Sequence, residues 1–175
     1  FNIYSMTEKE IRDICNNYNI INYSINSDMS VNVEGDVYLD SYKLEEIPLN
    51  FNKVTGGFYC FNNKLTSLKG CPKIVGTINC SVNYLTSLEY SPNIVNEAFI
   101  CHNNRLTTLK GITKNIKENL YIGRNNIRSF QYFPDSVNTL YSGYNPIDEL
   151  WYLFVNKNYI SYFNELDVIQ NNEKD

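Results

Sequence analysis

Positive charge is scarce in this 175-residue sequence, and so are long apolar runs. Fifteen lysines and arginines stand against nineteen aspartates and glutamates, which gives a net charge of −4. A protein that grips a phosphate backbone needs a basic stripe to displace counterions, so we expect no nucleic-acid partner. No stretch approaches the roughly 18 apolar residues of a membrane span, and residues 1–10 lack a basic segment followed by an apolar core. We therefore expect a cytoplasmic protein without an export signal or a membrane partner.

Paired cysteine motifs are also missing. The five cysteines, at positions 15, 60, 71, 80 and 101, are odd in number and include no Cys-x-x-Cys pair. This spacing resembles neither a disulfide framework nor a zinc site and fits a reducing compartment. Cys60, Cys80 and Cys101 recur at one place in successive repeats, where we interpret them as small packing residues. We predict no metal and no cofactor.

Histidine occurs once, at His102, which the pattern described below places on an outward strand position. Ser81 could lie one strand spacing away as a nucleophile. A flat sheet, however, offers these two residues neither a pocket nor a set of oxyanion donors. We therefore predict no catalytic residues and no enzymatic activity.

A self-similar unit of 20 to 21 residues fills most of the chain. Leucine or isoleucine recurs at Leu44, Leu65, Leu85, Leu106, Ile127 and Ile147. A second apolar residue follows three positions later, at Ile47, Leu68, Leu88, Leu109, Phe130 and Leu150. An asparagine stands two positions earlier in five repeats, at Asn63, Asn83, Asn104, Asn125 and Asn145. A period in this range predicts a solenoid of the leucine-rich-repeat type.

The alternation within each unit predicts a parallel sheet on the concave face. We expect strands near residues 36–40, 57–61, 77–81, 98–102, 119–123 and 139–143, with alternate residues pointing into the core. Prolines recur on the far side of the coil at Pro48, Pro72, Pro92 and Pro134. Because proline restricts φ and removes a donor, we predict an extended or polyproline-like convex side rather than a helical one. The asparagines should be buried and bonded to the backbone of adjacent coils.

The chain ends predict caps on a single domain spanning residues 1–175. Thr7 and Glu10 form a capping box for a short helix, and residues 21–33 alternate around Ser27-Asp28 like a hairpin. Asn145-Pro146, followed by acidic residues, predicts the start of a helix. We accordingly divide the domain into an N-terminal cap (1–34), repeats (35–146) and a C-terminal helical cap (147–175).

The repeats resemble those of a known group. Segments 65–68, 85–88 and 106–109, which read Leu-Thr-Ser/Thr-Leu, are similar to the short bacterial-type leucine-rich repeats of secreted effectors, including effector ubiquitin ligases. The Cys-x-x-Asn-x-Leu-Thr-Ser-Leu spacing, the hairpin and the Asn-Pro-Ile helix resemble small bacteriophage-encoded repeat proteins even more. The effector resemblance implies a substrate-binding surface. The sequence shows no further domain that could carry a ligase cysteine, so that activity is not transferred.

Two outward rows of the predicted sheet are the candidate site. One row reads Tyr38, Tyr59, Asn79, Ile100, Tyr121, Tyr141, and the other reads Asp40, Phe61, Ser81, His102, Gly123, Gly143. Aromatic side chains at this density on a solvated face are typical of a protein interface. The predicted partner-binding residues are Tyr38, Asp40, Tyr59, Phe61, Asn79, Ile100, His102, Tyr121 and Tyr141. Lys43, Lys64, Arg105 and Arg124 lie beside this face and suggest an acidic rim on the partner.

We interpret the chain as a non-enzymatic protein-binding module. By analogy with the phage proteins, it would bind and perturb a host bacterial protein such as a defence component. Three alternatives stay open at this point. The aromatic residues could form a ladder that only supports the strands, Tyr38, Tyr59, Phe61 and His102 could line a small-molecule or enzymatic pocket, or the face could be a permanent contact in a virion or other assembly.

Overall fold

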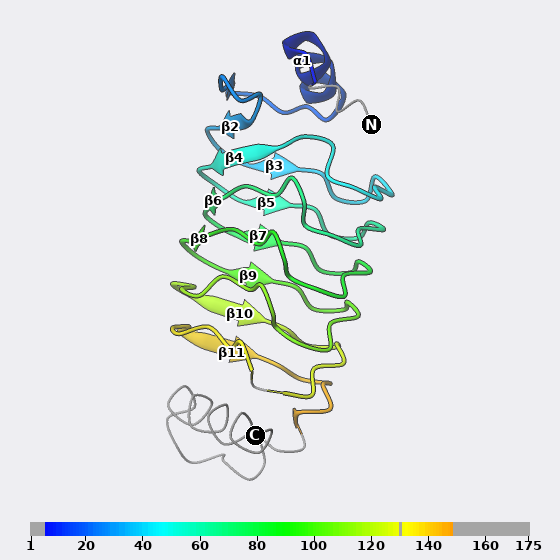
Figure 1. Ribbon diagram of the computed structural model, residues 1–175, viewed down its shortest axis with the longest axis vertical. Coiled ribbons are helices and arrows are strands. Elements are labelled where there is room, and N and C mark those ends of the chain that lie inside the picture. The colour runs from blue at the N-terminus through cyan, green and yellow to red at the C-terminus, as the bar shows by residue number, and fades with distance from the viewer. Residues whose placement is uncertain (1–5, 130, 149–175) are drawn as a thin grey trace.

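The computed structural model describes residues 6–129 and 131–148 as a stack of coils capped by one helix (Figure 1). Helix α1 (Glu8–Asn17) sits at the N-terminal end of the stack. The capping box is confirmed: the Thr7 amide donates to Glu10 Oε2 over 2.7 Å, and the Glu10 amide donates to Thr7 Oγ1 over 3.3 Å. Ile11 and Cys15 on the inner face of α1 are buried, so the helix closes this end of the core.

The N-terminal hairpin is also confirmed. Strand β1 (Tyr23–Ile25) pairs antiparallel with β2 (Val31–Val33). Asp28 Oδ1 accepts from both the amide and the hydroxyl of Ser30, at 3.1 and 2.5 Å, which closes the turn. At the other end, the backbone amide of Asn145 donates to Asp148 Oδ2 over 2.7 Å. A contact of this kind is typical of the N-terminus of a helix. The predicted C-terminal helix itself lies outside the described residues from position 149 onward.

All six predicted strands are present and form one parallel sheet, although each spans two or three residues. In chain order they are β3 (Val37–Tyr38), β5 (Phe58–Tyr59), β7 (Ile78–Asn79), β9 (Phe99–Ile100), β10 (Asn119–Tyr121) and β11 (Thr139–Tyr141). Their order in the sheet is β11-β10-β9-β7-β5-β3. Val37, Phe58, Ile78, Phe99 and Leu120 point inward and are fully buried, as the alternation predicts.

The opposite side of the coils carries a second sheet that the sequence analysis did not predict. Strands β4 (Phe51–Val54), β6 (Ile74–Val75) and β8 (Ile94–Val95) continue from the hairpin in the order β1-β2-β4-β6-β8, parallel from β2 onward. The prediction of an extended, non-helical convex side is confirmed, and its strands pair by hydrogen bonds that a polyproline helix would not make. Pro72 and Pro92 each precede a strand by two residues, so the ladder loses none of its donors.

The asparagine column ties the coils together, and its predicted burial and backbone bonding are confirmed. The side-chain Nδ2 of Asn104 donates to the carbonyl oxygens of Cys80 and Cys101, at 3.0 and 3.1 Å. Its Oδ1 accepts from the backbone amide of Leu85 at 3.0 Å. The same pattern recurs at Asn63, Asn83, Asn125 and Asn145. Each asparagine therefore connects its own coil to the preceding one.

Every strand of the six-stranded sheet leads into a residue with positive φ. These residues are Ser41, Asn62, Val82, Asn103, Arg124 and Tyr144, with φ between 51° and 67°. Asparagine adopts this left-handed region readily, whereas a β-branched residue such as Val82, at φ 53°, is strained there.

We therefore expect Val82→Asn to raise the free energy of unfolding by about 1 kcal/mol. The Val82 side chain is 42% exposed, so little packing is lost, and its amide keeps the bond to the His102 carbonyl. Ile94→Asn is the matched control, because Ile94 is 43% exposed but lies in the extended strand β8. Urea unfolding of both variants should show stabilisation at position 82 alone, and an equal loss at both positions would contradict the strain argument.

Candidate partner-binding face

The outward surface of the six-stranded sheet, here called the tyrosine face, carries two stacked pairs of rings. Tyr38 and Tyr59 stack with ring centroids 5.1 Å apart and an interplanar angle of 11°. Tyr121 and Tyr141 stack at 4.3 Å and 3°. Strands β5 and β10 are three strand spacings apart in the sheet, which places the two pairs about 14 Å from each other. The aromatic surface is therefore divided into two anchors rather than continuous.

Asp36 and Gly57 hold the first pair in place. The Tyr38 hydroxyl donates to Asp36 Oδ2 over 3.0 Å, and Asp36 Oδ1 accepts from the Gly57 amide at 2.7 Å. A Cβ on Gly57 would lie 2.4 Å from the ring atoms of Tyr59, so the ring occupies the space left by the missing side chain. The bond to Asp36 raises the pKa of Tyr38, and burial raises the pKa of Tyr59. Both phenols therefore stay neutral and able to donate.

The sequence analysis missed both of these supporting residues. Asp36 and Gly57 each stand two positions before a tyrosine of the outward row. Residues at this spacing share one side of a strand, which is the signal that could have found them.

The middle of the tyrosine face has no stacked tyrosines and is mostly polar. Asn79, Ile100 and His102 are all half-buried, and Ser81 is buried. The Ser81 hydroxyl donates to Asn79 Oδ1 over 2.7 Å, and His102 Nδ1 accepts from the Asn103 amide at 2.7 Å. Burial and the nearby Arg124 charge lower the pKa of His102. These hydrogen bonds tie Ser81 and His102 to other partners rather than to each other as a dyad.

The remaining predicted site residues, Asp40 and Phe61, lie past the ends of two strands. Asp40 and Phe61 are half-buried at the C-terminal ends of β3 and β5, on the second outward row. A hollow of about 420 Å³ lies at the turns beyond the sheet. Its lining is Asn103, Asn104, Arg124, Asn125, Asn126 and Tyr144. This hollow contains none of Tyr38, Tyr59, Phe61 and His102, so it is distinct from the pocket considered in the sequence analysis.

The cysteines are buried, free thiols. Cys60, Cys80 and Cys101 have no exposed surface, and burial raises their pKa values well above the ordinary range. In the part of the chain that the structure describes, no three His, Cys, Asp or Glu residues are grouped so that they could hold a metal ion. Within the same residues, no helix has the length and apolarity needed to cross a bilayer.

The comparisons with known proteins bear on the fold. No protein-family model matches the chain, and no curated protein matches it either. Among solved structures, a Shigella effector LRR (leucine-rich-repeat) domain is similar, with a TM-score of 0.55 and 23% sequence identity. The match covers 63% of this chain and 49% of the Shigella chain, so the chain spans about half the length of that neighbour. The chain has a leucine-rich-repeat solenoid fold with repeats like those of a bacterial effector, as predicted, while the resemblance to phage-encoded proteins stays a prediction.

Proposed function

We propose that the protein is a binding module that takes a protein partner on its tyrosine face. The observation that carries this proposal is the pair of tyrosine stacks on a surface that no other described element covers. Tyr38 is 56% exposed and Tyr141 is 49% exposed, so each stack presents an open ring to solvent. Tyrosine is enriched at interface hot spots because it combines a large area and a polar tip with few rotatable bonds.

The stacks could also serve as a ladder that only stabilises the strands. The outer rings, Tyr38 and Tyr141, favour a binding role in addition. A ring that contacts its neighbour on one side leaves its other side free to contact a partner. In addition, Asp36 and Gly57 orient the first pair, which lowers the entropy cost of binding through it. The similar Shigella structure is an effector domain, which supports a role in recognition by analogy of fold.

The finer proposal concerns the source and the target. The sequence resemblance favours a phage-encoded, cytoplasmic protein that binds a host protein, such as a defence component, and perturbs its activity. This proposal rests on the resemblance described above. It requires that the partner be found in the cells that host the protein.

Affinity for a captured partner tests the tyrosine face directly. The wild type would be used to isolate a partner, which is then purified and titrated against single variants. We expect Tyr38→Ala or Tyr141→Ala to weaken binding by about 2 kcal/mol at the stronger of the two positions, with a melting temperature close to that of the wild type. Gly57→Ala should also weaken binding, because its methyl group displaces the ring of Tyr59.

Tyr90→Ala is the control for this comparison. Tyr90 is 62% exposed but lies in a loop after the Leu85–Leu88 segment, away from the tyrosine face. Equal affinity of all four variants and the wild type would exclude the tyrosine face as the site. Loss of stability without loss of affinity would instead identify the stacks as a structural ladder.

A further inference from the structure

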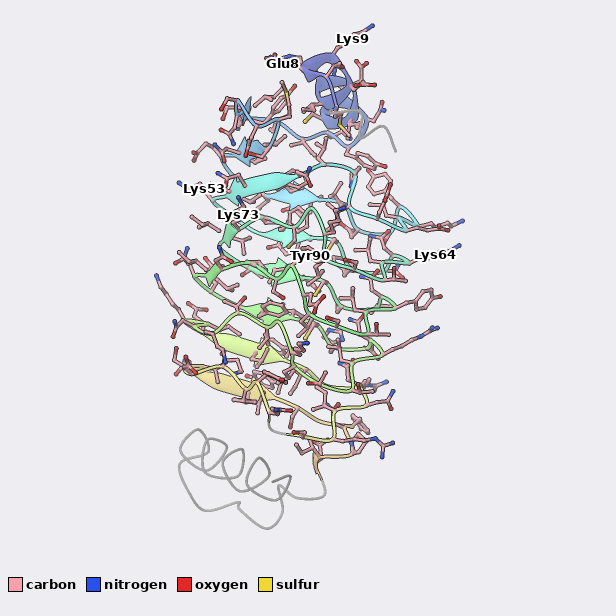
Figure 2. All side chains as sticks on the ribbon, in the orientation of Figure 1. Glu8, Lys9, Lys53, Lys64, Lys73 and Tyr90 are labelled. Atoms are coloured by element: carbon pink, nitrogen blue, oxygen red, sulfur yellow. The ribbon has the colours of Figure 1, made fainter. Side chains whose placement is uncertain are left out.

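A second surface adjoins the tyrosine face, where the strands of the six-stranded sheet end. We call it the turn edge and define it as residues 62–66, 82–86, 103–107 and 124–128 together with Tyr144. These four middle segments contain Lys64, Arg105, Arg124 and Arg128 and no aspartate or glutamate, whereas the equivalent segments of the first and last coils hold Glu45 and Asp148. Figure 2 shows Lys64 projecting on the opposite side of the solenoid from Lys53 and Lys73. The turn edge is therefore a locally basic strip on an acidic protein.

Two arginines of the turn edge are held against tyrosine rings. Arg105 Cζ lies 4.3 Å from the ring centroid of Tyr84, and Arg124 Cζ lies 5.0 Å from that of Tyr144. A guanidinium over an aromatic ring is attracted to the face of the ring and still has N–H groups on its other sides that can donate to a ligand. Among the described residues, neither guanidinium has an ion pair or a hydrogen bond, and the ion pair that is present joins Arg12 to Glu8 on α1. The guanidinium groups of Arg105 and Arg124, here called forks for their paired N–H donors, are thus available to bind a ligand.

The hollow of about 420 Å³ lies beside one of these forks. Arg124, Tyr144 and Asn126 form its exposed walls together with the half-buried Asn103. Its lining contains one cation and four side-chain amides but no carboxylate. Asn104 and Asn125 belong to the buried asparagine column, so their amides are already bonded to backbone carbonyls. The groups left to meet a ligand are the Arg124 fork and the Asn126 amide, which suit an anionic oxygen.

We propose that the turn edge binds an acidic segment of a protein partner, with one carboxylate in the hollow on Arg124 and another on Arg105. The forks match the planar geometry of a carboxylate, and each can take one in a bidentate contact. A phosphate backbone needs a longer basic stripe than these four residues provide, because its binding depends on displacing counterions along the strand. This surface lies beside the tyrosine face, and its test needs no captured partner, so each proposal can fail while the other stands.

Synthetic peptides test the proposal on the intact chain. A fluorescein-labelled decapeptide of alternating Glu and Ser would be titrated by fluorescence anisotropy at about 0.1 M salt, where exposed charges more than about 10 Å apart are largely screened from each other. The Gln/Ser peptide and a ten-residue oligouridylate are the reference ligands. We expect Arg105→Glu and Arg124→Glu each to weaken binding of the acidic peptide about tenfold. Tyr84→Phe, which keeps the ring under Arg105, should leave the affinity unchanged.

Lys73→Glu is the matched control, because it makes the same change of charge at an exposed position beside β6 of the opposite sheet. It should alter the affinity less than twofold if binding is local to the turn edge. Exposed charges that are further apart than the Debye length, which is about 10 Å at 0.1 M salt, are largely screened from each other. Equal losses in Lys73→Glu and Arg105→Glu, or binding of the Gln/Ser peptide as tight as that of the Glu/Ser peptide, would overturn the proposal. Tighter binding of the oligouridylate than of the acidic peptide would replace it with a nucleic-acid site.

His102 supplies an independent readout. It is the single histidine of the chain, so its ring signal is unambiguous in NMR spectra of untagged protein. The nearby Arg124 charge helps to lower the pKa of His102. A carboxylate bound to Arg124 would offset that charge, so the pKa of His102 should rise when the Glu/Ser peptide is added and stay unchanged with the Gln/Ser peptide. An unchanged pKa at saturating acidic peptide would exclude the hollow as the seat of the carboxylate.

Discussion

Replacing Phe99 by alanine should lower the free energy of unfolding by about 4 kcal/mol, the loss typical of a phenylalanine removed from a packed core. Phe99 is fully buried in β9, in the inward column between Ile78 and Leu120. The coil is thin and held by sheets on both sides, so its backbone has little freedom to close the resulting cavity. Urea denaturation followed by circular dichroism would measure the change.

The adjacent residue is the control for this prediction. Ile100 points outward and is half-buried, so Ile100→Ala should cost about 1 kcal/mol or less. A shift of strand register by one residue would exchange the inward and outward sets. A larger loss at Ile100 than at Phe99 would therefore contradict the register of the whole sheet.

Asn104→Ala should lower the free energy of unfolding by about 3 kcal/mol through lost hydrogen bonds rather than through lost apolar contact. Asn104 is 8% exposed. Its removal leaves the Leu85 backbone amide without an acceptor and takes a hydrogen-bond donor from the carbonyls of Cys80 and Cys101. An unsatisfied buried polar group costs about 1–3 kcal/mol. Because these bonds join neighbouring coils, their loss should also reduce the cooperativity of unfolding. This would appear as a smaller m value, the slope of the free energy of unfolding against urea concentration.

Asn93→Ala makes the same change at an exposed asparagine and should leave the free energy of unfolding within about 0.5 kcal/mol of the wild-type value. An Asn104→Ala midpoint equal to that of Asn93→Ala would show that the asparagine column contributes little to stability. Partner affinity is not a substitute measurement here. A destabilised solenoid would lose binding for reasons unrelated to its surface.

Several features could be predicted because neighbours in the sequence determine them. The repeat of leucine and asparagine positions specified the strands of the six-stranded sheet, the inward columns and the burial of Asn83 and Asn104. Thr7 and Glu10, three residues apart, specified the start of α1 in the same way. In each case the spacing places side chains on one side of a strand or within one helical turn, so no distant part of the chain needs to be known.

The sequence by itself thus determined the coil, its core, the outward rows and the asparagine bonds between coils, whereas the ring contacts between coils and the pairing of the second sheet depended on the tertiary structure. The tyrosine stacks, the pairing of β4, β6 and β8 and the stacking of Arg105 on Tyr84 all join residues about one repeat apart. The sequence shows that such residues lie on adjacent coils. It does not show which rotamers they adopt or whether a missing side chain, as at Gly57, opens the space for a ring. Coils of 20 and 21 residues also differ in their corners, and an offset of an ångström or two decides whether two rings stack or a hollow forms between turns.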